Sequence, residues 1–385
     1  MSDRRRVAEI EAVPTSEVVA LARELVRTDT VNPPGGEQAV AEQLAARLHA
    51  QAIPVEVLPF AAGRANLLAR LPGRDSSAPA LMLSGHLDTV AAGHQPWTRE
   101  VRSGDIVGDR LHGRGASDMK GGVAAMLVAF EAAAAGYHGR GDIVLALTGA
   151  EESGCQGARA LLPNLGRIGA VVVGEPTAGR VAVGHKGVLW VTLSASGRSA
   201  HASAPELGVN AIDRMTRVLA GVLQRDISAS AEGELGRPTL TVTTISGGVA
   251  RNIVPDSCTA QLDIRLTDAF SRDDALELVR AVAATSAGAD VVVDLDLPSV
   301  LTPVRDSWVS ELLHELGLGA TGKMTMNYFT DASVFGPALG VPVILYGPGE
   351  PTQAHQTDEW CSVSRIEESV EVYAKMIRWW GRSPR

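Results

Sequence analysis

Histidine and carboxylate side chains follow four short apolar segments, at residues 80–84, 142–147, 169–173 and 341–345. Each segment is followed within two residues by a glycine. Beyond these glycines lie His86, Asp88, Glu151, Glu152, Glu175 and His355. Imidazole and carboxylate ligands together suit a borderline metal ion such as zinc. These residue types predict a metal centre if the fold brings them together.

The elements that must position these side chains are indicated by the same segments. Short apolar runs bounded by glycine are typical of buried parallel strands. Between residues 80 and 175 they alternate with helical patterns, as in a βαβ fold. In such open sheets, ligands bind at the carboxyl ends of the strands. We therefore expect an α/β fold with a mostly parallel sheet flanked by helices, whose rim carries the metal ligands.

The pattern changes after residue 186. Alternating strand-like segments cover 187–196, 239–245, 259–266 and 291–297, and helical patterns cover 205–223 and 273–285. The order β-α-β-β-α-β is that of a ferredoxin-like unit. We predict an inserted lid or dimerisation domain at 187–298. Residues 1–186 and 299–385 would then form the catalytic di-metal domain.

Composition limits the partners and the compartment. The 385 residues carry a net charge of −9, with charges of both signs interspersed, which argues against nucleic acid or an anionic membrane as a partner. The three cysteines are far apart and form no CxxC pair, so a cytoplasmic location is the simplest expectation. Residues 1–11 lack the apolar core of a signal peptide. The longest apolar stretch, 123–135, is too short to span a bilayer.

Each candidate ligand also has a simpler interpretation. Asp88, two residues after His86, could fix the tautomer of a ligating imidazole or merely cap a turn. Asp118 precedes an apolar helical segment, so it could be the N-cap of that helix, a metal bridge, or both. Glu151 and Glu152 are adjacent like charges, which a bound cation or a solvated loop would accommodate.

The remaining two ligands are weak signals alone. Glu175 lies in a Gly-Glu-Pro-Thr sequence that often forms only a turn, and His355 could be an ordinary loop histidine. Competing motifs are incomplete or absent. The chain has no HExxH or GxSxG sequence, and the glycines before Lys186 lack the GK[ST] ending of a phosphate-binding loop.

Taken together, the motifs resemble those of a known family. His-Leu-Asp after a strand, Gly-Arg-Gly-x-x-Asp-Met-Lys-Gly-Gly, Glu-Glu-x-Gly, Gly-Glu-Pro-Thr and a late Ala-His occur in this order along the chain. The pattern is similar to that of the co-catalytic zinc aminoacylase/carboxypeptidase family. That family includes acetylornithine deacetylase, succinyl-diaminopimelate desuccinylase, aminoacylase and glutamate carboxypeptidase.

The resemblance implies a role for each residue in the motifs. Two zinc ions per subunit would be held, with Co²⁺ as an alternative ion. The implied ligands are His86 and Glu175 for one ion, Glu152 and His355 for the other, and Asp118 as the bridge. Asp88 would orient His86, and Glu151 would be the general base.

The resemblance also implies functional residues in the inserted domain. His201 matches a histidine that polarises the scissile carbonyl, often from a partner subunit, so a homodimer is expected. Asn252 and Arg265 match positions that hold polar groups of the substrate. For Arg265, an ion pair on the strand surface is an equally good interpretation, and Lys186 is a further candidate for contact with the substrate.

The expected function is that of a di-zinc amidohydrolase. Its substrates would be small N-acyl amino acids, as in the acetylornithine deacetylase and succinyl-diaminopimelate desuccinylase branch. One alternative is a dipeptidase or a metallopeptidase similar to glutamate carboxypeptidase. Another is a binding protein that kept the fold and lost catalysis, although the intact Glu151 and ligand set argue against it.

Overall fold

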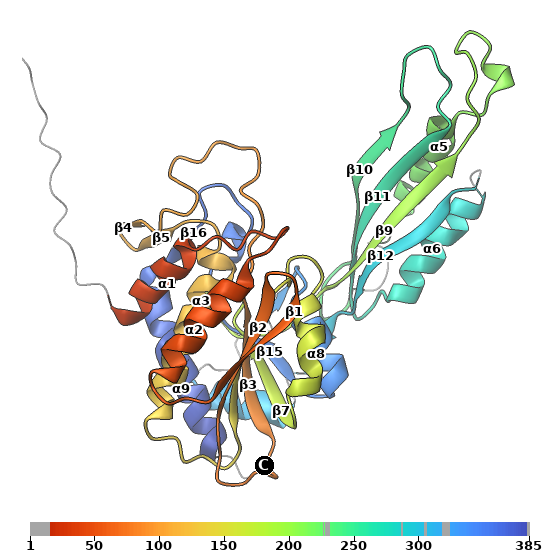
Figure 1. Ribbon diagram of the computed structural model, residues 1–385. Coiled ribbons are helices and arrows are strands. Elements are labelled where there is room, and N and C mark those ends of the chain that lie inside the picture. Colours follow the sequence, from red (N-terminus) through yellow and green to blue (C-terminus); the bar gives the residue numbers. More distant parts are fainter. Residues whose placement is uncertain are drawn as a thin grey trace, which may run out of the picture.

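The computed structural model describes residues 16–225, 227, 232–285, 288–303, 306–317 and 324–382. Residues 1–11, for which no signal peptide was predicted, lie outside these ranges. The chain forms two lobes (Figure 1). The larger lobe contains both ends of the described chain, and the narrower lobe is built from its middle part. Within the described residues, no helix combines the length and apolar character needed to cross a membrane.

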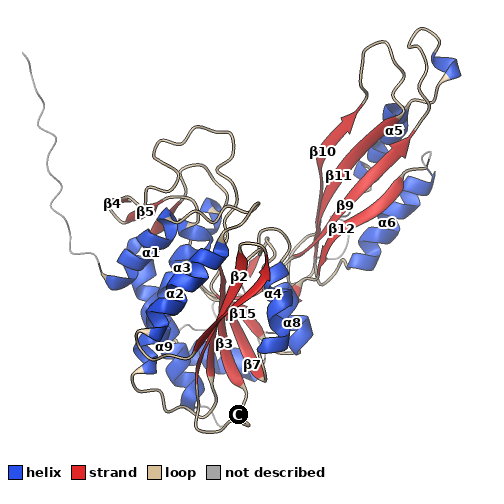
Figure 2. Ribbon diagram, in the orientation of Figure 1, coloured by secondary structure: helices blue, strands red, loops and turns tan. Residues whose placement is uncertain are grey.

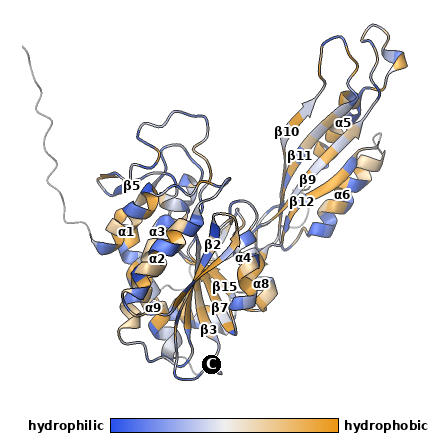
Figure 3. Cartoon of the chain, viewed as in Figure 1, coloured by the Kyte–Doolittle hydropathy of each residue, from blue (hydrophilic) through white to orange (hydrophobic). Residues whose placement is uncertain are grey.

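The larger lobe is built on one sheet with the strand order β1-β2-β6-β3-β7-β15-β8-β13, and β14 pairs with β8. The strands are β1 (Val55–Ala61), β2 (Arg64–Leu71), β3 (Ala80–His86), β6 (Ile143–Thr148), β7 (Ile168–Val173), β8 (Ala182–His185), β13 (Val300–Leu301), β14 (Met324–Met326) and β15 (Val343–Leu345). The four predicted strands β6, β3, β7 and β15 are neighbours and run parallel. Their buried apolar residues appear orange in Figure 3. The predicted mostly parallel arrangement around the site is therefore confirmed.

Helices cover both faces of this sheet (Figure 2). One face carries α1 (Glu17–Arg27), α2 (Glu37–His49), α3 (Gly121–Ala134), α7 (Ser307–Glu315) and α9 (Val363–Arg382). The other carries α4 (Gln156–Leu161) and α8 (Ala332–Leu339). The apolar stretch 123–135 falls in α3, which is buried between the sheet and α1 and α9. This is why α3 lacks the polar stripe of a surface helix.

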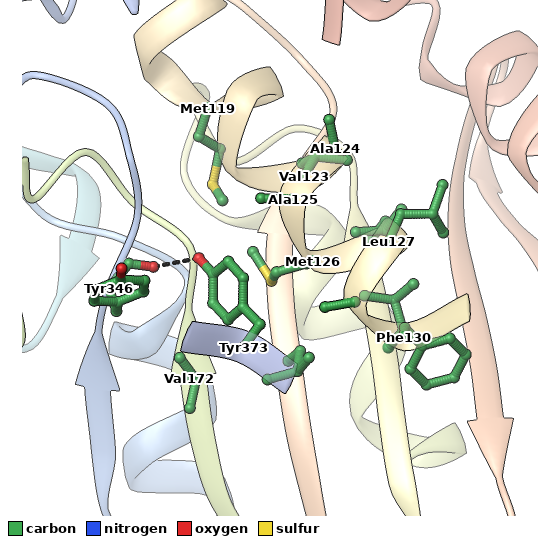
Figure 4. Packing of buried hydrophobic residues seen from close by; sticks show 14 of the residues in the cluster. Met119, Val123, Ala124, Ala125, Met126, Leu127, Phe130, Val172, Tyr346 and Tyr373 are labelled. Atoms are coloured by element: carbon green, nitrogen blue, oxygen red, sulfur yellow. Dashed lines mark hydrogen bonds between the residues drawn. The ribbon is translucent and has the colours of Figure 1, made fainter. Parts of the chain in front are cut away.

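The packing beneath the strand ends is shown in Figure 4. Met119, Val123 and Met126 are fully buried near the start of α3. Tyr373 of α9 packs edge-on against Tyr346, with ring centroids 5.4 Å apart, and its hydroxyl donates to the Tyr346 carbonyl oxygen. These contacts fix the beginning of α3 against the sheet.

A small sheet joins two distant segments beside the strand ends. It contains β4 (Ile106–Val107), β5 (Arg110–His112) and β16 (Trp360–Ser362), in the order β16-β5-β4. The pairing of β5 with β16 brings the segment before Asp118 against the segment after His355.

The narrower lobe is an antiparallel sheet of β9 (Gly187–Ser196), β10 (Thr239–Gly247), β11 (Ser257–Leu266) and β12 (Asp290–Leu297), in the order β10-β11-β9-β12. Helices α5 (Ala211–Leu223) and α6 (Arg272–Thr285) pack on one face and share a separate core with it. The predicted order of elements is confirmed. The helix expected over 205–223 begins only at Ala211, because the side chain of Asn210 caps it by accepting from the amides of Ile212 and Asp213.

Candidate metal centre

The predicted side chains lie at the carboxyl ends of the parallel strands, along one edge of the sheet. His86 is the last residue of β3, Glu151 and Glu152 follow β6, and Glu175 follows β7. His355 lies in the loop after β15. The convergence expected from the sequence is therefore present in the fold.

Asp118 lies between the two histidines. Its Oδ1 is 3.1 Å from His86 Nε2, and its Oδ2 is 3.5 Å from His355 Nε2. Glu152 Oε1 is 3.1 Å from the same nitrogen of His355. Donor atoms of His86, Asp118 and Glu152 lie within 4.8 Å of one another, so these residues can hold a metal ion. An aspartate facing two imidazoles with different oxygens has the form of a bridging ligand.

The alternative role of Asp118 as a helix cap is not observed. Helix α3 begins at Gly121, and no side chain caps it. Asp118 has φ −121° and ψ 91°, which is not helical. Its carboxylate is therefore available to the histidines rather than to the amides of the helix.

Asp88 contacts both the His86 ring and the loop that carries Glu151 and Glu152. Its Oδ1 accepts from the amide of Glu151, and its Oδ2 accepts from the amide of Glu152, both at 3.1 Å. The Nδ2 of Asn32 donates to the same Oδ2 at 2.9 Å. His86 Nδ1 is closer to the Asp88 carbonyl oxygen, at 3.0 Å, than to its carboxylate, at 3.6 Å. Asp88 thus contacts the His86 ring mainly through its backbone, while its carboxylate holds the loop of the two glutamates.

The carboxylates are crowded and buried. Burial, with the neighbouring carboxylates, raises the pKa values of Glu151 and Glu175 well above their usual range. Burial and Asp118 also raise the pKa of Glu152. For His355, burial lowers the pKa, but the carboxylates of Glu152 and Asp118 outweigh it and raise the value to about 9. These three glutamates resist ionisation mainly because burial removes the hydration of the charged form, and the neighbouring carboxylates add to this effect. The donor set therefore fits a multivalent cation, which would compensate the charges of the ionised forms.

Further polar residues at the site were not singled out from the sequence. Asp331 is buried, burial raises its pKa to about 6, and it accepts a hydrogen bond from the hydroxyl of Thr148 at the end of β6. The hydroxyl of Tyr328 donates to the Pro176 carbonyl oxygen at 2.8 Å. An aspartate before an apolar helix looks like an ordinary N-cap, so its position carried no specific signal.

The three functional residues expected in the narrower lobe are not together. His201 is exposed and pairs by a backbone bridge with Ile253, so it lies beside Asn252 beyond the far end of β11. Arg265 lies at the other end of β11, opposite Val188. Eight residues of extended strand separate the two ends, which corresponds to about 27 Å.

Arg265 lies where the two lobes meet. Asp263 pairs with it through two hydrogen bonds of 2.8 and 3.0 Å, and its guanidinium stacks 5.7 Å from the ring centre of Phe329. Its Nη1 is buried, with no hydrogen-bond partner among the described residues. The ion pair considered from the sequence is present, and it leaves Nη1 without a partner among the described residues.

Comparisons with known proteins identify the family. Residues 82–379 match the model of Peptidase family M20/M25/M40, so the chain belongs to this family of metal-dependent hydrolases. A succinyl-diaminopimelate desuccinylase of Rhodospirillum centenum is 31% identical over 397 residues, which covers 95% of this chain and 98% of that protein. The predicted family and hydrolase class are confirmed.

Solved structures share the fold. An M20 family metallo-carboxypeptidase from Sulfolobus solfataricus superimposes with a TM-score of 0.80 over 95% of this chain and 100% of its own, at 18% identity. A dinuclear metal-binding M20 peptidase from Bacillus subtilis gives a TM-score of 0.69 over 94% and 96% of the two chains, at 14% identity. At these identities the likeness extends to the fold alone.

Proposed function

We propose that this hydrolase is a di-zinc amidohydrolase that cleaves the amide bond of small N-acyl amino acids. The observation that carries the proposal is the position of Glu151. It is buried beside the candidate metal ligands, and its adjacent residue Glu152 contacts His355. A buried carboxylate beside a metal group can move a proton to and from the reacting groups, while its neighbour contacts a candidate metal ligand.

We assign His86 and Glu175 to one zinc ion, Glu152 and His355 to the other, and Asp118 to both. Such ions lower the pKa of a bound water and polarise a carbonyl group. Asp88 orients His86 through its carbonyl oxygen and holds the amides of both glutamates. The proposed metal ligands and the proposed base are thereby fixed in position relative to one another.

In the proposed reaction, Glu151 accepts a proton from the attacking water. It later donates this proton to the leaving amine, so its carboxylate ends the cycle unprotonated. The products are a carboxylic acid and a free amino acid. Burial raises the pKa of Glu151 well above that of a solvated glutamate, which favours the protonated form that donates to the amine.

The free α-carboxylate of the substrate is proposed to bind Arg265. Within the described part of the chain, the guanidinium keeps one buried nitrogen without a partner. Its charge lowers the pKa of Lys186, whose Nζ donates to the Arg237 carbonyl oxygen, so a second cation lies nearby. An acidic protein needs such a local cation to hold an anionic substrate.

His201 and Asn252 are proposed to act from a second subunit. They lie about 27 Å along β11 from Arg265, which is more than a small substrate can span. A homodimer formed through the narrower lobes, here proposed as the inserted domain 187–298, would bring the far end of one lobe to the neighbouring metal centre. His201 would then polarise the scissile carbonyl in trans.

Two measurements test the proposal. Elemental analysis should find close to two zinc ions per chain, with Co²⁺ able to replace them, and chelation should abolish hydrolysis. A panel of N-acetyl amino acids, N-succinyl amino acids and dipeptides should then show the highest kcat/KM for an N-acyl amino acid. Full activity of the metal-free protein would exclude the mechanism.

The same panel separates the second candidate, a carboxypeptidase or dipeptidase. The observation in its favour is a relative named probable carboxypeptidase from Aspergillus clavatus, which is 32% identical over 391 residues and covers 96% of this chain and 83% of that protein. Preference for peptides over all acyl substrates would select it. In both cases substrates amidated at the α-carboxylate should react poorly, and equal rates for free and amidated forms would exclude the role of Arg265.

A further inference from the structure

The loop that presents Asp118 closes around a buried carboxylate from another part of the chain. This carboxylate belongs to Glu359, whose side chain is fully buried. Its Oε1 accepts from the amides of Ser117 at 2.8 Å and Asp118 at 3.1 Å. Its Oε2 accepts from the amide of Gly115 at 3.0 Å and from Arg114 Nη1 at 2.7 Å.

These four donors satisfy the carboxylate completely, because each of its oxygens accepts two hydrogen bonds. Backbone amides that converge on one point form a concave site for an anion. Here the anion is the carboxylate of Glu359, which belongs to the protein itself. Gly115, with φ 83°, supplies the left-handed turn that directs the loop around it. The conformation of the Asp118 backbone is therefore defined by Glu359.

Glu359 also ties this loop to the loop of His355, four residues earlier in the chain. The Arg114 guanidinium that holds Glu359 also donates to the Gln356 carbonyl oxygen at 3.2 Å. The Ser117 hydroxyl donates to the Trp360 carbonyl oxygen at 2.7 Å. The two loops that carry Asp118 and His355 are thus joined on both sides of Glu359.

We infer that Glu359 is a positioning residue, which sets the place of Asp118 relative to His355 so that one aspartate can serve two metal ions. This role rests on the proposed metal site. A side chain that orients a ligand typically contributes about 10–100-fold to metal affinity. Glu359 itself has no oxygen left for the metal.

The test measures zinc affinity by competition with a chromophoric chelator, using the full chain. Glu359→Gln keeps the shape but loses the charge and two acceptor positions, and we expect its affinity to fall about 10–100-fold. The absorption spectrum of the Co²⁺-loaded protein should change as well, because the bridging geometry shifts. Excess zinc should restore part of the activity.

The matched control is Glu131→Gln. Glu131 is another buried acid, paired with Arg47 through two contacts of 2.7 Å, but it lies ten residues into α3, about 15 Å from its start. This variant should lose stability and keep wild-type zinc affinity and cobalt spectrum. A purely structural role for Glu359 would make the two variants alike.

Wild-type zinc affinity in folded Glu359→Gln would overturn the inference. If that variant does not fold, Glu359→Asp takes its place, because the shorter side chain keeps the charge but cannot reach Arg114 and all three amides. Wild-type affinity there is equally decisive against the role. A wild-type protein that binds no zinc would instead refute the metal site, and the positioning role with it.

Discussion

At the scale of single residues, the two adjacent glutamates of the site differ in the contacts that their side chains make. Glu152 contacts His355, whereas the buried side chain of Glu151 lies 3.9 Å from the Cys155 sulfur. Asp88 holds the amides of both residues, so the backbone does not distinguish them. Their different side-chain contacts are the basis for assigning one to the proton and the other to the metal.

This assignment predicts the behaviour of Glu151→Gln. The variant keeps the size of the side chain and removes the base, so turnover should fall by at least about 10²–10⁴-fold. Metal content, measured by elemental analysis, should stay near the wild-type value. Glu152→Gln is the matched control, and it should lose metal. If Glu151→Gln lost its zinc or kept most of its activity, the two roles would have to be exchanged.

A second prediction concerns His185, which is buried at the end of β8. Its Nδ1 lies 2.8 Å from the Lys186 carbonyl oxygen and its Nε2 lies 3.2 Å from the Thr330 hydroxyl, so one nitrogen donates and the other accepts. Burial lowers its pKa to about 4. The folded state thus keeps the ring neutral, while the unfolded chain protonates it below about pH 6.5.

The contribution of the neutral His185 ring to the free energy of unfolding is therefore complete above pH 6.5, and it is lost as the pH falls toward 4. The full loss is about 3 kcal/mol. Urea unfolding of the metal-free protein between pH 4.5 and 7 measures it, with His185→Asn as the non-titrating control. The wild type should show a steeper loss of stability toward acid than the variant. Parallel curves would mean that His185 does not titrate differently in the two states.

At the scale of elements, α3 approaches the strand ends unusually closely. A Cβ atom on Gly122 would lie 2.4 Å from the Gly174 carbonyl oxygen, which immediately precedes Glu175. In an open helix, replacing glycine by alanine stabilises by about 1 kcal/mol. Here the added methyl group would press on backbone atoms next to a proposed metal ligand.

Gly122→Ala should therefore destabilise the protein by about 1–3 kcal/mol, as overpacking does. Gly136→Ala is the control, because no atom of the described residues, apart from its two chain neighbours, lies within 4 Å of its Cβ position. Thermal or urea unfolding of both variants measures the contrast. A stabilised Gly122→Ala protein would show that α3 can move away from the sheet without cost.

The strands were easier to predict from the sequence than the hydrogen-bond partners of the residues at the site. Apolar runs bounded by glycine are local signals, and they located the strand that ends at His86 and the strands that precede Glu151 and Glu175. The partner of the Asp118 amide was not predictable in this way, because Glu359 lies 241 residues further along the chain. The glutamate stands in a polar segment without periodicity, and only the pairing of β5 with β16 brings it inside.

At the scale of the whole molecule, the residues of the narrower lobe that we propose to contact the substrate lie at opposite ends of that lobe. Arg265 lies at the end of β11 next to the larger lobe, whereas His201 lies beyond the other end of this strand, and Figure 1 shows the two ends of β11. A trans arrangement predicts complementation between inactive variants. Mixing His201→Ala with Glu151→Gln, under conditions of subunit exchange, should restore activity.

Only one site of each mixed dimer contains both intact residues. With random pairing, the recovered activity should therefore approach about one quarter of the wild-type value per subunit. Each variant mixed with itself is the control. If no mixing ratio restored hydrolysis, the sites would be complete within one chain. A fully active monomer in sedimentation would lead to the same conclusion.

The narrower lobe leaves and rejoins the larger one at adjacent points. Strands β8 and β13 pair antiparallel, with His185 opposite Val300, and β9 and β12 continue that pairing where Val188 faces Leu297. Deleting the residues between these strands and adding a short turn would leave an ordinary β-hairpin. The narrower lobe therefore takes the place of the turn in a β-hairpin formed by β8 and β13. The entropic cost of closing such a loop grows slowly with its length, so evolution could enlarge or exchange this lobe without redesigning the catalytic scaffold.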